Sequence, residues 1–234
     1  DHNANMLREQ IKEKVRDYDK VIFVAASKGV SDFVHYFLNY SKDLTAKERE
    51  KIKVMVSLSG VTRNSQIASW ITESDSAKAR LIRTALTLKG QAEAKEGLKS
   101  LSTDQWEGHN PSKISKDFPK MTWISMPMLP EGDEGHTERD KLASFIRNNV
   151  YKESKSIGPS DGLVETAGSV LPPHTGLTEW IVRAYGPHGL ALGSFQDGTK
   201  LAPENIKSET KAKPEAGPEI LDAFFRALPT SVLK

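Results

Sequence analysis

A short apolar strand that ends abruptly in a small polar turn is the feature that most constrains how this chain can fold. Residues 21–26 read Val-Ile-Phe-Val-Ala-Ala, a run typical of a strand buried inside a sheet. Ser27, Lys28 and Gly29 follow at once, and from Val30 onward the apolar residues take helical spacing. The sequence therefore predicts a sharp strand-to-helix turn with a serine at its tip.

Such a turn suits a nucleophilic serine. It would hold the hydroxyl of Ser27 at the carboxyl edge of a parallel sheet, with the N-terminal dipole of the next helix directed at the reacting atom. Ala25 lies two residues before Ser27 and Gly29 two residues after it, so both flanks are small, as a tight turn requires. An ordinary strand-to-helix turn without catalytic function is the alternative interpretation.

Two further motifs follow in a particular order. Asp161 begins the segment Asp-Gly-Leu-Val, and His188 lies between Pro187 and Gly189. Serine, acid, histidine is the chain order of the triad in α/β-hydrolases. The chain resembles this superfamily, in particular its lipase-like and esterase-like branches, also in residues 169–172 (Ser-Val-Leu-Pro) and 54–61, which end in Ser-Leu-Ser-Gly-Val.

The resemblance implies a mostly parallel sheet flanked by helices and the hydrolysis of a carboxylic ester through an acyl-enzyme. Ser27 would be the nucleophile, His188 the general base and acid, and Asp161 the residue that orients the imidazole. The backbone N–H of Lys28 would supply one oxyanion-hole donor, while the second donor remains unassigned. Adjacent side chains diverge in such a turn, so we expect Lys28 to lie at the surface instead of forming a dyad with Ser27.

Some site residues have rivals in the sequence. Asp133 follows a predicted strand and is the alternative acid, and His174 is the alternative histidine. His35 lies inside the predicted helix after the turn, where we expect it to be packed. The remaining histidines fall in polar stretches, and we expect them to be solvated: His2, His109 and His136.

Composition narrows the range of partners. The 234 residues include 33 basic and 31 acidic ones, a net charge of +2, which gives no strong field for nucleic acid. The apolar runs are too short to form a transmembrane segment. No cysteine is present and no metal or nucleotide motif is visible, so we expect neither a cofactor nor a metal. The substrate class left by these exclusions is a small-molecule or lipid ester. The sequence does not indicate a compartment.

Residues 1–234 are interpreted as one α/β domain. Strands are expected at residues 20–26, 53–58, 121–126 and 179–185, with crossovers long enough for parallel pairing. Helices are expected at residues 5–16, 30–40 and 218–228. Residues 64–118 form a helical insertion, which is a candidate lid or cap or, alternatively, a helical hairpin without function.

Strands that normally precede the serine strand are missing from this pattern. We therefore expect an N-terminal segment or a partner chain to complete the sheet, because the serine strand would otherwise form an apolar edge. Two other functions stay open: an acyltransferase that uses the same triad, and a non-catalytic binding or scaffold protein with the same fold.

Overall fold

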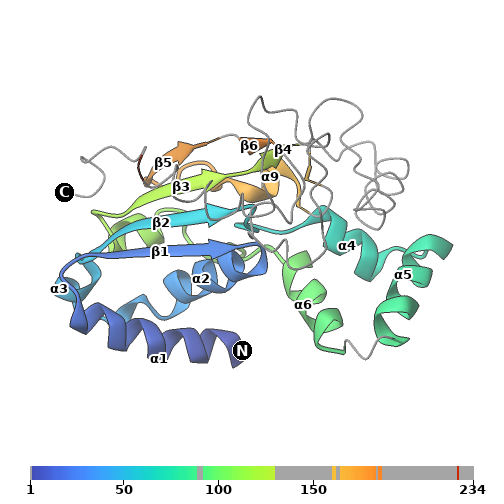
Figure 1. Ribbon diagram of the computed structural model, residues 1–234, viewed down its shortest axis with the longest axis horizontal. Helices are drawn as coiled ribbons and strands as arrows, with labels where there is room; N and C mark the ends of the chain where they lie inside the picture. Colours follow the sequence, from blue (N-terminus) through green and yellow to red (C-terminus); the bar gives the residue numbers. More distant parts are fainter. Residues whose placement is uncertain are drawn as a thin grey trace.

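The computed structural model describes residues 2–88, 92–129, 160–161, 164–182, 184–185 and 226. A four-stranded parallel sheet in the order β1-β2-β3-β5 forms its centre (Figure 1). The strands of this sheet are β1 (Val21–Ala26), β2 (Ile52–Leu58), β3 (Thr122–Met126) and β5 (Thr178–Ile181). A second, two-stranded sheet pairs β4 (Met128–Leu129) with β6 (Ala184–Tyr185).

These elements confirm most of the sequence predictions. The first three strands agree with the predicted ones within one residue at either end, and all pair in parallel as expected. The predicted strand at 179–185 is instead divided between two sheets. After β5, the Val182 amide donates to the carbonyl of Ser125 in β3, and the chain then joins β4.

Helices occupy the connections, as predicted. They are α1 (His2–Asp17), α2 (Lys28–Asn39), α3 (Ala46–Arg49), α4 (Gln66–Glu73), α5 (Ala77–Leu88), α6 (Ala92–Ser102), α7 (Lys113–Asp117) and α9 (Thr166–Ser169), with a short 3₁₀ helix at Ser41–Asp43. The predicted helix at 218–228 lies outside the described residues, except for Arg226.

The main core lies between α1, α2 and one face of the sheet. Val30, Val34 and Phe37 of α2 are completely buried there, at the helical spacing that the sequence predicted. Phe37 stacks edge-on against Phe118 and Trp123, with ring centroids 4.9 Å and 6.4 Å apart. This packing fixes α2 against the strands and so positions its N-terminus.

The described part of the insertion falls into two regions. Helices α4, α5 and α6 form their own small core, lined by Ile67, Trp70, Ile71, Ala79 and Ile82. By contrast, Trp106, Ile114 and Phe118 near its end belong to the main core. Figure 1 shows α4, α5 and α6 beyond the arrowheads of β1 and β2, at the carboxyl edge of the sheet. Within the described residues, no helix is long and apolar enough to cross a bilayer.

Candidate active site

Ser27 has a backbone conformation that side-chain-bearing residues rarely adopt. It lies between the end of β1 and the first residue of α2, with φ 52° and ψ −127°. This region of φ/ψ space is strained for residues with a Cβ atom, at a cost of about 1–3 kcal/mol. Strain of this kind persists only where the surrounding structure holds it in place, and it is concentrated at functional sites.

Backbone hydrogen bonds on both sides hold Ser27 in this conformation. Its amide donates to the carbonyl of Leu58 at 3.0 Å, which continues the pairing of β1 with β2. Its carbonyl accepts from the amides of Val30 and Val61, each at 3.2 Å. The turn is therefore tied both to its own helix and to the loop after β2.

Gly60, in that loop, permits the close approach. A Cβ atom at Gly60 would lie 2.3 Å from Ser57 Oγ and 2.3 Å from Val30 Cγ2. At Gly29 an added Cβ would meet only the Cβ of Ala25, at an ordinary 3.8 Å. The sequence indicated that the turn needs a very small residue at position 29. In the structure this requirement is strongest at Gly60 instead, which the sequence analysis named only as part of residues 54–61.

The first turn of α2 offers backbone donors beside Ser27. Among the described residues, the amides of Lys28 and Gly29 donate no hydrogen bond. The Lys28 ammonium pairs with Asp32 at 2.5 Å and its side chain is 31% exposed, so the expected surface position is only partly correct. An anion formed next to Ser27 would meet free N–H groups and a positive helix end.

Asp161 lies in a compact turn. Its Oδ1 accepts from the Val164 amide at 2.8 Å, and its own amide donates to the Val164 carbonyl at 3.1 Å. The residue is only 6% exposed. The bonds between Asp161 and Val164 therefore fix one oxygen of a buried carboxylate.

The segment that follows Asp161 is bonded to the loop after β2. Thr62 donates from its amide and its hydroxyl to the carbonyl of Gly168, both at 2.8 Å, and its hydroxyl also lies 2.5 Å from the Val170 carbonyl. Since Val61 is bonded to Ser27, the loop of Val61 and Thr62 connects the serine turn to the Asp161 segment. The loop after β2 thus contacts both the serine turn and residues 168–170.

A second buried carboxyl accompanies Asp161. Glu165 is 3% exposed, and its Oε1 accepts from the Ile67 amide at 2.6 Å. Its Oε2 has no hydrogen-bond partner in the part of the chain that the structure describes. Burial raises the pKa of this carboxyl, and the charge of Asp161 raises it further. The sequence analysis missed Glu165, although it directly follows the Asp-Gly-Leu-Val motif.

Ser59 resembles Ser27 in its backbone but does not belong to the site, because its side chain is completely buried. It follows β2 as Ser27 follows β1 and has φ 43°. Its hydroxyl is buried and has no hydrogen-bond partner among the described residues. The only sequence signal for this similarity is that Ser59, like Ser27, directly follows an apolar strand.

The histidines divide into three groups. His188, the predicted base, and His136 lie outside the described residues, as does the alternative acid Asp133. His174 is exposed in a turn with φ 66°. His35 is half-buried on α2 beside Tyr40, as predicted.

His109 departs from the prediction for the polar stretches. It is half-buried, and burial lowers the pKa of its imidazole. The expectation of a solvated His109 was therefore wrong. The side chain of His2 is not among those described.

Comparisons with known proteins identify the fold of the chain. No protein-family model and no curated protein matches the chain. A crystal structure of the mature lipase BlEst2 from Bacillus licheniformis matches with a TM-score of 0.58 and 16% identity, covering 96% of this chain and 72% of that chain. The chain has an α/β-hydrolase-like fold. At this identity the likeness is one of fold, and the chemistry rests on the residues themselves.

Proposed function

We propose that this protein is a serine hydrolase that cleaves a carboxylic ester through an acyl-enzyme. Ser27 is the nucleophile, His188 the general base and acid, and Asp161 the orienting acid. The observation that carries the proposal is the strained backbone of Ser27 at the junction of β1 and α2. The likeness to a lipase structure supports the choice of an ester as substrate.

The reaction uses each of these groups in turn. The imidazole of His188 takes the proton of the Ser27 hydroxyl as Oγ attacks the ester carbonyl, and a tetrahedral oxyanion forms. The free amide of Lys28 and the N-terminus of α2 stabilise that charge. Collapse expels the alcohol, which receives the proton from His188. Water then attacks the acyl-enzyme in the same way, releasing the acid.

Asp161 acts through His188 in this scheme. A buried carboxylate fixes the tautomer of the imidazole and stabilises the imidazolium. Burial of Asp161 and its bonds within the turn suit that task, because the carboxylate is held in place before the substrate arrives. Asp133 is the alternative acid, and His174 the alternative base.

The helices α4, α5 and α6 are proposed as the cap over this site. They stand at the carboxyl edge of the sheet, and a Cβ at Gly97 of α6 would lie 3.8 Å from Cδ of Lys28 (Figure 1). A cap in this position would shape the pocket for the acyl group and limit the access of water.

Two other functions remain as alternatives. An acyltransferase would use the same residues and pass the acyl group to an alcohol instead of water. A scaffold protein would keep the fold without turnover. Adding a competing alcohol and analysing the products separates the first from hydrolysis, and an absence of serine-dependent turnover identifies the second.

The test is the hydrolysis of p-nitrophenyl esters from acetate to decanoate. Ser27→Ala should reduce turnover on the order of 10³-fold or more, since the covalent route is lost. Ser59→Ala is the matched control, because Ser59 also follows a strand with positive φ, and this variant should keep its activity. Equal loss in both variants, or turnover that survives Ser27→Ala, would contradict the proposal.

A further inference from the structure

The side chain of Glu165 joins the segment of Asp161 to a helix of the proposed cap. Its Oε1 accepts from the amide of Ile67, the second residue of α4, at 2.6 Å. Ile67 lies 98 residues earlier in the chain, so this bond connects two distant segments. Burying a carboxyl is costly unless its bonds compensate for the lost hydration. The bond to α4 is therefore a specific feature of the fold, and the proposed reaction does not yet use it.

The backbone of Glu165 lies directly beside Asp161. Ser160 and Glu165 form an isolated antiparallel bridge. Between them, the Val164 amide donates to Asp161 Oδ1 at 2.8 Å, and the Asp161 amide donates to the Val164 carbonyl at 3.1 Å. The bridge and these bonds leave Asp161 little freedom relative to Glu165. A contact that fixes Glu165 therefore also fixes Asp161.

Glu165 supplies the nearer of two attachments between this segment and the loop after β2 with α4. The farther attachment is that of Thr62, which donates to the carbonyls of Gly168 and Val170. Glu165 lies between these residues and Asp161 in the chain. Loss of the Glu165 carboxyl would leave the attachment at residues 168–170 and remove the one closer to Asp161.

Capping of α4 alone does not account for this carboxyl. Ser65 is already the N-cap of the helix, and its Oγ accepts from the amide of Ala68 at 3.1 Å. Hydroxyl and amide side chains satisfy such amides without a charge. Glu165, by contrast, is a long acidic side chain that is only 3% exposed. Its length is what lets it reach from the Asp161 segment to α4.

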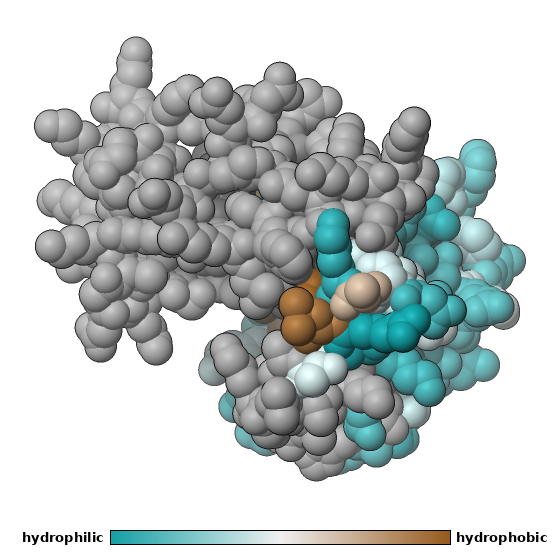
Figure 2. Space-filling view, turned by 90° about the vertical axis from the view of Figure 1, so that its right-hand side faces the viewer, coloured by the Kyte–Doolittle hydropathy of each residue, from teal (hydrophilic) through white to brown (hydrophobic). Residues whose placement is uncertain are grey.

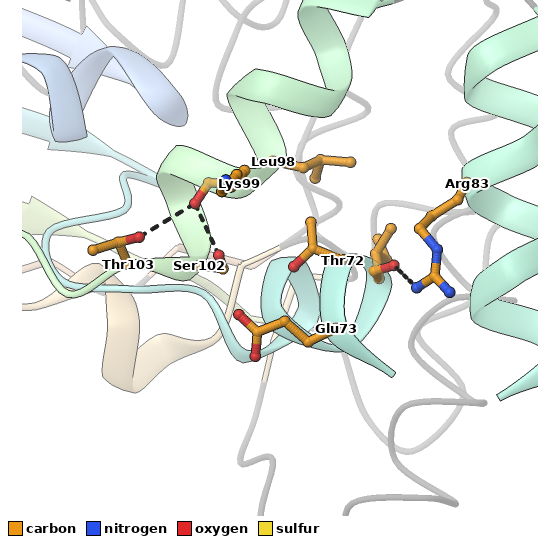
Figure 3. Close-up of a pocket in the computed structure, with 8 residues that line it drawn as sticks. Thr72, Glu73, Arg83, Leu98, Lys99, Ser102 and Thr103 are labelled. Atoms are coloured by element: carbon orange, nitrogen blue, oxygen red, sulfur yellow. Dashed lines mark hydrogen bonds between the residues drawn. The ribbon is translucent and has the colours of Figure 1, made fainter. Parts of the chain in front are cut away.

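The other end of α4 is held by α5. Arg83 donates from Nη1 to the carbonyls of Ile71 and Ser74, at 2.6 Å and 3.0 Å (Figure 3). The last turn of α4 borders a cavity of about 360 Å³ instead of close-packed side chains. On the side of the molecule that carries α4 and α5, Figure 2 shows a small apolar patch bordered by hydrophilic residues. The position of α4 thus depends on the bonds at its two ends as well as on its small core.

We propose that Glu165 is a positioning residue, which holds Asp161 against α4 so that the orienting acid and the cap keep a fixed relation. Glu165 has this role only if the proposed function holds, because it acts through Asp161 on the imidazole of His188. A catalytic group displaced by about 1 Å can cost about 10²-fold in rate. The attachment to α4 prevents such a displacement.

Three variants separate positioning from helix capping, with p-nitrophenyl esters as substrates. Glu165→Gln keeps an oxygen for the Ile67 amide, so its kcat should be like that of the parent. Glu165→Leu has a similar size but no acceptor, and its kcat should fall about ten- to a hundredfold. Ser76→Ala is the matched control. It removes the acceptor of the Ala79 amide in the first turn of α5, a bond of 3.3 Å, and should keep the kcat of the parent.

The pH profile of kcat/KM distinguishes positioning from a loss of stability. A nearby carboxylate favours the imidazolium, so the pKa of the histidine base falls when Asp161 moves away. The acid limb of the profile should therefore move to lower pH in Glu165→Leu and stay in place in Glu165→Gln and Ser76→Ala. An acid limb that does not move in Glu165→Leu, or an equal loss of kcat in Glu165→Leu and Ser76→Ala, would overturn the proposal.

Hydrogen exchange measures the hold on Asp161 without any turnover. The amides of Asp161 and Val164 should exchange about tenfold faster in Glu165→Leu than in the parent, because this segment opens more often. The amide of Phe118, bonded to the Ile114 carbonyl in the main core, serves as the reference for global unfolding. Unchanged exchange at Asp161 and Val164 would mean that Glu165 does not hold this segment.

These readouts keep the two proposals apart. A parent protein without serine-dependent turnover contradicts the proposed function, whereas the exchange of the Asp161 and Val164 amides still decides whether Glu165 holds the segment. Circular dichroism shows whether each variant is folded. If Glu165→Leu is not folded, Glu165→Met takes its place, since methionine is as long as glutamate and lacks the carboxyl oxygen.

Discussion

Replacing Gly60 with alanine tests whether the serine turn depends on close contact with the loop after β2. The new Cβ would lie 2.3 Å from Ser57 Oγ, 2.3 Å from Val30 Cγ2 and 2.6 Å from Val30 Cβ. Non-bonded carbon atoms pack best at about 3.5–4.0 Å, so each contact is about an ångström or more too short. Both neighbours are fully buried, and the clash must move α2 or β2.

The magnitude follows from the cost of overpacking. Added methyl groups in a packed core cost about 1–3 kcal/mol, and three short contacts with buried groups place Gly60→Ala at the upper end, about 3 kcal/mol. For a chain of this size, that corresponds to a fall in the melting temperature of about 6–12 °C. Because Val61 is bonded to the carbonyl of Ser27, activity should fall as well.

Urea unfolding followed by circular dichroism measures the effect. Gly29→Ala is the matched control, since its Cβ would meet only Ala25 Cβ at 3.8 Å, and it should lie within about 1 kcal/mol of the parent. Val30→Ala removes the Cγ2 contact, so the double variant should be more stable than the sum of the single changes predicts. A Gly60→Ala protein as stable as the parent, or strict additivity with Val30→Ala, would refute the reasoning.

Two further predictions concern the buried acid and the edge of the sheet. Burial raises the pKa of Glu165 above its ordinary 4.5, so the folded state binds the proton of this carboxyl more tightly than the unfolded state does. Protonation of Glu165 therefore stabilises the fold. This contribution is complete below pH 4.5 and is lost as the pH rises through the raised pKa. Glu165→Gln should flatten this part of the stability profile in urea titrations at several pH values and gain about 1–3 kcal/mol above it. Parallel profiles for the two proteins would count against a raised pKa of the Glu165 carboxyl. At the edge of the described sheet, β1 pairs with β2 alone among the described strands, and Ile22 and Val24 are 38% and 41% exposed. Ile22→Lys with Val24→Lys should reduce concentration-dependent association in sedimentation velocity, since charges protect an apolar edge, and an unchanged profile would exclude the edge as the contact.

The sequence was sufficient to predict those features that depend on residues close to one another along the chain. The apolar run before Ser27 and the spacing of Val30, Val34 and Phe37 specify a strand, a turn and a helix locally. The closeness of Asp161 to Ser27 stays a prediction from the order of the motifs, while the bonds of Thr62 connect the loop after β2 to Gly168 and Val170, which follow Asp161 in the chain.

Other features arise from contacts between distant segments, which no local pattern encodes. The need for glycine at residue 60 comes from Val30, thirty positions earlier in the chain. The burial of Glu165 depends on the amide of Ile67 in α4. The ion pair of Lys28 with Asp32 could have been predicted from their spacing of four residues in a helix. The partial burial of the Lys28 side chain could not, because it depends on α6.

The most direct test of the central claim is labelling with a serine-directed fluorophosphonate, read by intact mass and peptide mapping. We expect one adduct, on the hydroxyl of Ser27, which is absent from Ser27→Ala and retained in Ser59→Ala. Labelling should slow as the pH falls through the pKa of the histidine base, ordinarily about 6.5. A folded protein that takes up no label, or takes it up on another serine, would contradict the assignment of Ser27 as the nucleophile.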